Sequence, residues 1–270
     1  MEFNPIDLRA TILNMAYQGQ SVHIGCAFSL VEVCAVLYRS ILNLGDKTPL
    51  SKDRDYLVMS KGHGVMAQYA CMRELGWISE NEIQNYFGNG TFLKGLSEAN
   101  VPGLEVSSGS LGHGLSVGVG LALGCLKKND NRKIFCIVGD GEMNEGSIWE
   151  GILFASHFKL QNFFLIVDEN SLQAMGPTKE VMDMGDIGKK LEAFGFTTLN
   201  AEGHNQKDLL EKFNQLLALN DGKPKAIVAK TVKGYGISFM ANKNTWHYTR
   251  LTEETYKEAL KELEGKRREK

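Results

Sequence analysis

The sequence lacks the features of several large protein classes. Its 270 residues carry a formal net charge of only -2, so there is no overall positive field to attract nucleic acid or an anionic membrane. No stretch reaches the ~20 apolar residues that a membrane-spanning helix requires. The most apolar helix candidate, residues 115–126, runs directly into Lys127 and Lys128. At the N-terminus, Arg9 interrupts an amphipathic pattern that is typical of a helix and not of a signal peptide. We therefore expect a protein that binds neither nucleic acid nor membranes.

Cysteine is scarce as well, and its spacing forms no framework. The five cysteines are odd in number, contain no CxxC pair and mostly lie in apolar runs, at positions 26, 34, 71, 125 and 136. This pattern favours reduced core residues, and it indicates neither a disulfide framework nor a zinc site. We therefore expect a cytoplasmic protein.

Alternating strand-like and helical patterns fill the second half of the chain. Four β-like runs occur, at residues 133–139, 162–169, 196–203 and 225–232, and helical patterns separate them at 147–158, 185–194 and 206–218. Strands that are apolar throughout and alternate with helices are typical of a parallel sheet buried on both faces. The sequence therefore predicts an α/β fold, a doubly wound and mainly parallel sheet with helices on both faces.

The first half is more helical. Helices are predicted at residues 6–18 and 29–42, the second apolar on most sides and therefore buried. A short strand then runs into the turn SKGHG, which carries His63, and another helix continues through Leu75. The following stretch, residues 85–112, is rich in glycine and irregular. A loop of this length inside a compact domain indicates either a functional site or an element that the pattern fails to reveal.

The end of the chain predicts one more helix. Residues 251–270 form an amphipathic pattern that begins at a capping residue, Thr252. The sequence contains no repeat, low-complexity tract or clear linker, and its length suits one large unit. We therefore expect residues 1–270 to form a single domain.

Acidic and amide residues at two strand ends give the strongest functional signal. One apolar run ends in Gly139-Asp140-Gly141, and the next ends in Asp168-Glu169-Asn170. Ligands of open parallel sheets bind beyond the carboxyl ends of the strands, so Asp140 and Asn170 are expected on one rim. Such oxygen donors suit Mg²⁺ or Ca²⁺, and glycines at a helix N-terminus let a phosphate approach the backbone. A cation that holds a diphosphate is therefore one candidate explanation of the pattern.

Two other interpretations of this strand end stay open at the level of the residues. Asp140 could simply cap the helix that follows it. Alternatively, the glycines could belong to a dinucleotide site, although those at 139, 141 and 146 are spaced GxGx₄G where the dinucleotide fingerprint requires GxGxxG. The Gly-Lys-Ser/Thr of a P-loop is missing.

Seven motifs follow one another along nearly the whole chain: QSVHIG, LVMSKGHG, VPGLEVSSGSLGHGLSVGVGLALG, VGDGEMNEGSIWEG, LIVDENSLQAMG, KTVKGYGISFM and WHY. Together they resemble the thiamine diphosphate enzymes and, more narrowly, the N-terminal, diphosphate-binding half of transketolase in its two-chain form. The resemblance implies a subunit that moves a two-carbon ketol unit from a phosphorylated or otherwise anionic ketose to an aldose. It also implies thiamine diphosphate and Mg²⁺ or Ca²⁺ as cofactors.

The resemblance further implies roles for individual residues. The metal ligands would be Asp140, Asn170 and the backbone carbonyl of Leu172, and the backbone of Gly141 would contact the diphosphate. Catalytic histidines would be His23, which matches one that faces the substrate, and His63 and His247, near the phosphates and the reacting end of the cofactor. The remaining cofactor-binding positions are Gly109, Ser110 and Leu111, which would line the aminopyrimidine, Glu145 and Glu150, which match acids at the subunit interface, and Lys233.

Histidines suit this chemistry because substrate hydroxyl groups gain and lose protons in ketol transfer, and imidazole titrates near neutral pH. Of the other three histidines, His113 is expected to pack beside the cofactor loop without reacting, and His157 and His204 are expected to be structural or exposed.

Two parts of the family pattern are missing. The activating glutamate belongs to the pyrimidine-binding half, so the resemblance implies a separate partner chain, an α₂β₂ assembly and no activity of this chain alone. The family's Gly-His-Pro, whose histidine touches the donor sugar, is replaced by residues 92–98, which contain no histidine. The donor is therefore either held differently or not a standard pentulose or hexulose phosphate.

Other functions compete with this interpretation. The α subunit of a 2-oxo acid dehydrogenase or decarboxylase has a similar acidic strand end, but the motifs LEVSSGSLGHG and SKGHG argue against it. A non-catalytic assembly subunit would have no need of intact Asp140, Asn170, His23 and His63. A nicotinamide-dependent dehydrogenase is the most distant alternative.

Overall fold

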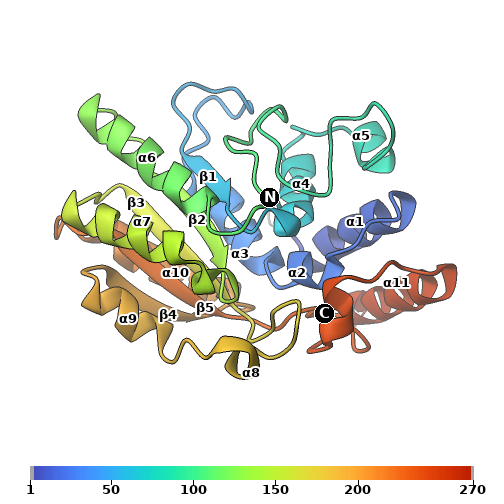
Figure 1. The fold of residues 1–270 in the computed structure, drawn as a ribbon. Helices are drawn as coiled ribbons and strands as arrows, with labels where there is room; N and C mark the ends of the chain where they lie inside the picture. The colour runs from blue at the N-terminus through green and yellow to red at the C-terminus, as the bar shows by residue number, and fades with distance from the viewer. Residues whose placement is uncertain (1–2, 269–270) are drawn as a thin grey trace.

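Within residues 3–268, which the computed structural model describes, five parallel strands form one central sheet (Figure 1). The order across the sheet is β1-β2-β3-β5-β4, and every neighbouring pair is parallel. The strands are β1 (Tyr56–Met59), β2 (Ile134–Gly139), β3 (Phe163–Glu169), β4 (Thr197–Glu202) and β5 (Lys225–Lys230). The predicted α/β class with a parallel sheet is confirmed.

Both faces of the sheet are buried, which explains why the strands are apolar throughout. In β2, Phe135 and Ile137 belong to one hydrophobic cluster, whereas Ile134, Cys136 and Val138 belong to a second cluster on the opposite face. Successive side chains of a strand point to opposite faces, so a strand between two helical layers needs apolar residues at every position.

Helices pack on each face of the sheet (Figure 1). The first hydrophobic cluster is built with α1 (Pro5–Gln18), α2 (Ile24–Phe28), α3 (Val31–Val36), α4 (Val65–Glu74), α10 (Gln206–Ala218) and α11 (Glu253–Arg268). The second is built with α6 (Gly114–Lys127), α7 (Gly146–His157) and α9 (Ile187–Ala193). No helix of the described residues is long and apolar enough to cross a membrane.

The helix predicted at residues 29–42 differs from the structure. The chain is already helical in α2, within the stretch expected to be a loop, and α3 passes at Leu37 into a π-helical turn, η1 (Leu37–Ile41). All of α3 is buried, including Glu32. A segment that is buried on every side has no polar face, so its hydrophobic pattern does not define where one helical turn gives way to another.

Two five-residue helices also went unpredicted: α5 (Glu80–Gln84), which begins with a capping box between Ser79 and Glu82, and α8 (Thr178–Met182). A single turn is too short to show helical periodicity. Residues 85–112 contain neither helix nor strand, as expected.

The C-terminal helix agrees with its prediction. The Thr252 hydroxyl accepts a hydrogen bond from the Thr255 N–H at the start of α11, and Leu263 is buried, with Tyr256 and Leu260 packed against the core. The predicted helix therefore lies where expected, although residues 269–270 of the predicted tail lie outside the described residues.

Candidate functional site

A cavity of about 600 Å³ lies at the carboxyl ends of β2 and β3. Its wall includes most of the residues singled out in the sequence: His23, His63, Gly109, Leu111, Asp140, Gly141, Glu145, Asn170, Leu172, Lys233 and His247. Ser110 and Glu150 do not line it, although Ser110 adjoins two residues that do. The fold therefore brings together side chains that are more than 200 positions apart in the sequence.

The acidic end of β2 forms one wall. Gly139 pairs with Asp168 across β2 and β3, so Asp140 and Asn170 emerge side by side. The Asp140 carboxylate is buried and accepts hydrogen bonds from the N–H groups of Gly141, at 2.8 Å, and Ser171, at 2.6 Å. Neither η3 (Glu142–Asn144) nor α7 has a side-chain N-cap, so Asp140 does not cap the helix that follows it.

Asp140 lacks sufficient compensation for its charge. Burial, and secondarily the nearby Asp168, raise the pKa of Asp140 to about 6. A divalent cation at this carboxylate would favour its ionised form. The neighbouring Asn170 side chain is also buried, and its amide oxygen accepts from the Leu172 N–H at 3.1 Å. Carboxylate and amide oxygens thus stand together where a hard cation could bind.

A buried ion pair between Lys61 and Asp168, to which the sequence gave no predicted role, lies beside the cavity, and its Lys61 lines the wall. The Lys61 ammonium donates to the Asp168 carboxylate, which also accepts from the hydroxyls of Ser29 and Thr231. Burial alone would raise the pKa of Asp168, but Lys61 and these hydroxyls outweigh it and hold that pKa below its usual range. Asp168 in turn accepts from the Asn170 amide at 3.2 Å and so orients the predicted metal ligand.

Glu142 is a second residue without a predicted role. Its buried carboxylate accepts from the Ser60 hydroxyl at 2.6 Å and from the N–H groups of Gly112, at 2.9 Å, and Gly139, at 3.3 Å. These partners lie in three segments that each contribute a residue to the cavity wall: the turn after β1, the glycine-rich segment before α6, and the end of β2. The sequence shows an acid at this position, but it does not indicate which groups donate hydrogen bonds to it.

Three imidazoles face one another on the other side of the cavity. The ring centroid of His23 lies 5.2 Å from that of His63 and 5.6 Å from that of His247, and the latter two are 5.5 Å apart. His23 has a left-handed backbone conformation, with φ of 66°, immediately before α2. Burial, aided by the charges of Lys233 and Lys61, lowers the pKa of His23 to about 4 and of His247 to about 3. Burial lowers the pKa of His63 well below its usual value. All three rings are therefore neutral at pH 7.

Lys233 connects the histidines to the metal-ligand wall. Its ammonium donates to His247 Nδ1 and to the Leu172 carbonyl, each at 2.8 Å. Because Nδ1 accepts this bond, the neutral His247 ring carries its proton on Nε2.

Glu145 lines the cavity and is exposed. Glu150, His113 and His157 are exposed too, but they do not line the cavity. His204 is structural: its Nε2 accepts from the Val232 N–H at 2.8 Å, which leaves Nδ1 to donate to Glu32 at 2.9 Å. His204 also borders a larger groove, of about 1200 Å³, beside α1 and α10, but none of the predicted site residues lines that groove.

The parallel sheet and the polar cavity at its strand ends define an α/β cofactor-binding domain. The sequence matches the family described as "Transketolase, thiamine diphosphate binding domain" over residues 6–269. The chain belongs to this family. Its function is that of a transketolase-like transferase that uses thiamine diphosphate.

Relatives fall into two size classes. The chain is 37% identical over 256 residues to one subunit of an apulose-4-phosphate transketolase of Phocaeicola vulgatus, covering 94% of this chain and 90% of that protein. It is 35% identical to a 6-deoxy-6-sulfo-D-fructose transketolase subunit of a Clostridium species, covering 90% and 88%. Human transketolase is 32% identical, but this chain spans only 41% of it. The solved Leishmania mexicana transketolase superposes with a TM-score of 0.88 at 26% identity, covering 96% of this chain and 40% of that chain.

Proposed function

We propose that this chain is the diphosphate-binding subunit of a two-chain transketolase, which transfers a two-carbon ketol unit from an anionic ketose to an aldose. The observation that carries the proposal is the single cavity that gathers Asp140, Asn170, the Leu172 carbonyl and three neutral histidines. A role in carbohydrate metabolism and a cytoplasmic location belong to the same proposal; five free, buried cysteines suit a reducing compartment.

Asp140, Asn170 and the Leu172 carbonyl would hold Mg²⁺ or Ca²⁺, with water and diphosphate oxygens completing the coordination. The cavity fits such a group in a second respect. Among the described residues, the buried Nε2 of Gln173 and Oδ1 of Asn144 have no hydrogen-bond partner, and both residues line the cavity. Buried polar atoms are normally paired, so the Gln173 amide is available to a diphosphate oxygen beside Gly141.

Thiamine diphosphate supplies the nucleophilic carbon and the electron sink when it is bound. The chain's own residues would position the substrate and carry protons. A neutral imidazole accepts a proton at one ring nitrogen and donates at the other, so His23, His63 and His247 can serve the substrate hydroxyl oxygens. Lys233 fixes the His247 tautomer, which places that ring's proton on Nε2. Gly109, Ser110 and Leu111 would contact the aminopyrimidine.

A partner chain would complete the enzyme. The chain spans 41% of human transketolase, and relatives of similar length are named as subunits. We infer that the partner supplies the pyrimidine-binding half with its activating glutamate, in an α₂β₂ assembly. Glu145 and Glu150 are exposed, as residues at a subunit contact would be in the isolated chain.

The donor sugar would carry an anionic group, which side chains of the partner hold. Residues 92–98 provide no donor histidine, and Leu96, 38% exposed, lines the cavity from this segment. Two relatives are named for apulose 4-phosphate and 6-deoxy-6-sulfo-D-fructose, both anionic ketoses.

Replacement of Asp140 tests the proposed metal ligand. In the Asp140→Ala chain, Mg²⁺-dependent binding of thiamine diphosphate should weaken by more than the roughly 10–100-fold that loss of an outer-shell partner costs. Asp53→Ala, at an exposed position away from the cavity, is the matched control. Isothermal titration calorimetry with and without Mg²⁺ measures both variants. Binding that survives Asp140→Ala unchanged would contradict the ligand assignment.

A further inference from the structure

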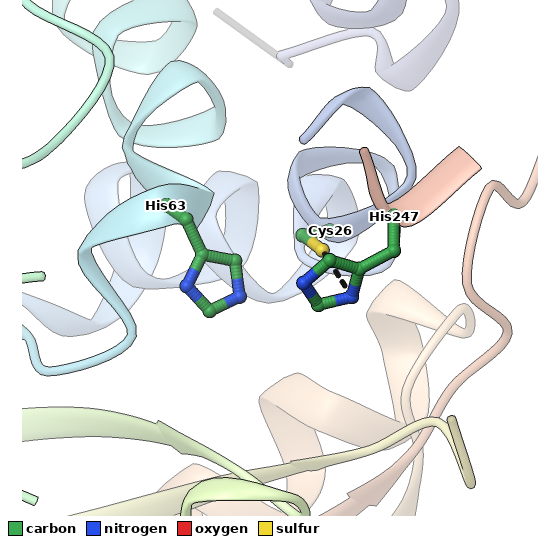
Figure 2. A group of neighbouring side chains, drawn as sticks. All are labelled: Cys26, His63 and His247. Carbon is green, nitrogen blue, oxygen red and sulfur yellow. Dashed lines mark hydrogen bonds between the residues drawn. The ribbon is translucent and has the colours of Figure 1, made fainter. Parts of the chain in front are cut away.

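Cys26 lies beside two of the cavity histidines, and the proposed reaction gives it no role. Cys26 comes from α2, His63 from η2 (Gly62–Gly64) and His247 from η4 (Asn244–His247). Figure 2 shows that the three side chains point into one space. One potential ligand atom from each of them, the cysteine sulfur and a nitrogen of each ring, lies within 4.8 Å of the other two.

This spacing approaches that of a tetrahedral metal site. Metal–sulfur and metal–nitrogen bonds of about 2.3 Å and 2.0–2.1 Å place neighbouring sulfur and nitrogen ligands about 3.5 Å apart. Cys26 Sγ is 3.7 Å from His247 Nδ1, so this pair requires almost no movement. His63 would approach by about 1 Å. His23, whose ring adjoins both other histidines, can supply the fourth ligand, and water is the alternative.

The donor atoms are of the kind that transition metals prefer. Thiolate and imidazole ligands bind Zn²⁺ and similar ions, whereas Mg²⁺ and Ca²⁺ prefer oxygen. The lowered pKa values leave the three rings neutral, with lone pairs available for a metal. Burial raises the pKa of the Cys26 thiol, so it is protonated without a metal, and coordination releases that proton to solvent.

Two lysines set the electrostatic cost of such a site. The charge of Lys61 is compensated by Asp168. Lys233 donates to His247 Nδ1, and an ion at that nitrogen would displace this bond while Lys233 keeps the Leu172 carbonyl as an acceptor. The carboxylate of Asp140 lies in the same cavity and favours a cation there.

We propose that Cys26, His63 and His247 form a second metal site, selective for Zn²⁺-like ions and separate from the oxygen site at Asp140 and Asn170. A metal held there occupies two of the three histidines that the proposed reaction requires, so it blocks ketol transfer. This consequence rests on the proposed function, whereas binding of the ion does not.

Cobalt(II) is the probe, because its absorption reports both the geometry and the presence of a sulfur ligand. Titration of the chelator-treated full-length chain should give visible tetrahedral bands and a near-ultraviolet thiolate-to-metal band, and both should reach their full intensity with one ion per chain in the sulfur site. Zn²⁺ should displace the cobalt, and a large excess of Mg²⁺ should not. Absence of both bands, or displacement by Mg²⁺, overturns the proposal.

Serine variants assign the sulfur. Cys26→Ser should remove the near-ultraviolet band and weaken Co²⁺ binding at least about 10-fold. The control is Cys34→Ser, at a buried cysteine of the neighbouring α3 that does not line the cavity. This variant should change neither the near-ultraviolet band nor the affinity for Co²⁺. Survival of the band in Cys26→Ser overturns the assignment, as does its loss in a folded Cys34→Ser variant.

X-ray absorption of the cobalt-loaded wild-type chain needs no variant and so guards against misfolding. One sulfur neighbour together with nitrogen neighbours supports the site, and a shell of oxygen or nitrogen alone refutes it. Calorimetry of Mg²⁺ and thiamine diphosphate on the same preparation separates the two hypotheses, because either binding reaction can fail while the other persists.

Discussion

At the scale of single residues, the protonation state of the cavity histidines is set by their surroundings. His23, His63 and His247 are partly buried near Lys61 and Lys233, and both burial and positive charge disfavour the imidazolium form. Neutral rings both accept and donate hydrogen bonds, which suits proton exchange with sugar hydroxyls and also suits metal binding. The same electrostatics thus support both proposals.

The histidine protonation states can be measured directly. His23 and His247 should remain neutral from pH 8 down to about pH 5, whereas histidines of the urea-unfolded chain should titrate near 6.5. Nitrogen-detected NMR measures the protonation of each ring, and the variants His23→Asn and His247→Asn assign the two signals. A titration midpoint above about 6 for either ring in the folded chain would show that burial and the nearby lysines do not lower its pKa as expected.

The lowered pKa values also affect the stability of the fold. Because the folded pKa is the lower one, the unfolded chain binds more protons at pH values between the two. The free energy of unfolding should therefore fall as the pH drops below about 6.5.

At the scale of elements, one buried network joins α1, α3, the turn before α10 and the segment after β5. Arg9 donates two hydrogen bonds to Glu32, at 2.7 and 2.9 Å, and Glu32 also accepts from His204. His204 accepts from the Val232 N–H, next to Lys233. The network therefore positions the segment that carries Lys233 into the cavity. It also explains how the otherwise apolar α3 accommodates a charged residue.

Removal of the Glu32 charge from this network should be costly, because it leaves the buried Arg9 guanidinium with backbone carbonyl acceptors but without a counter-charge. We expect Glu32→Gln to lower the free energy of unfolding at pH 7 by about 3–5 kcal/mol, and Arg9→Met/Glu32→Leu to recover most of this loss. Glu74→Gln, in a partly exposed pair with Arg73, should cost no more than about 1 kcal/mol. Urea denaturation measures all three. A cost for Glu32→Gln as small as that for Glu74→Gln would disprove a stabilising pair.

The pH dependence of the same pair has a definite sign. Burial alone would raise the pKa of Glu32, but Arg9 and His204 outweigh it and hold the pKa below its usual value. The contribution of Glu32 to stability is therefore present above the pKa of an unfolded glutamate, near about 4.3, and is lost as the pH falls through the lower folded value. Below that value the stability difference between the wild type and Glu32→Gln should shrink.

At the scale of the whole molecule, we propose that the chain carries one side of an active site. The cavity has the proposed metal ligands and histidines, but relatives that comprise one long chain are more than twice its length. Large apolar side chains are also exposed on α7 and at its end, among them Leu153, Phe154 and Phe158. These features fit a chain that functions as part of an assembly.

Activity should therefore depend on the partner. The purified chain should show no ketol transfer, and co-purification with the pyrimidine-binding chain should restore it. Light scattering should give the mass of two copies of each chain. The Asp140→Ala complex should assemble but show no turnover, which separates assembly from catalysis. Clear transfer by the isolated chain would refute the dependence, and release of CO₂ from pyruvate by the complex would favour the 2-oxo acid enzyme instead.

The sequence by itself determined the fold class, most helices and strands, and the meeting of Asp140 with Asn170 at one rim. Those inferences depend on hydrophobic periodicity and on strand direction, which are properties of short segments. The ordered motifs also identified the family. Single turns such as α5 and the π-helical turn after α3 were missed because they are too short or too uniformly buried to carry a period.

Only the tertiary structure decided which side chains meet. Lys61 and Asp168 are 107 positions apart, and Cys26 and His247 are 221 apart. Their pairing depends on how the strands are ordered and how the loops return over the sheet, and local sequence patterns do not encode either. The same holds for Glu142, an acid visible in the sequence whose three partners become neighbours only when the walls of the cavity assemble.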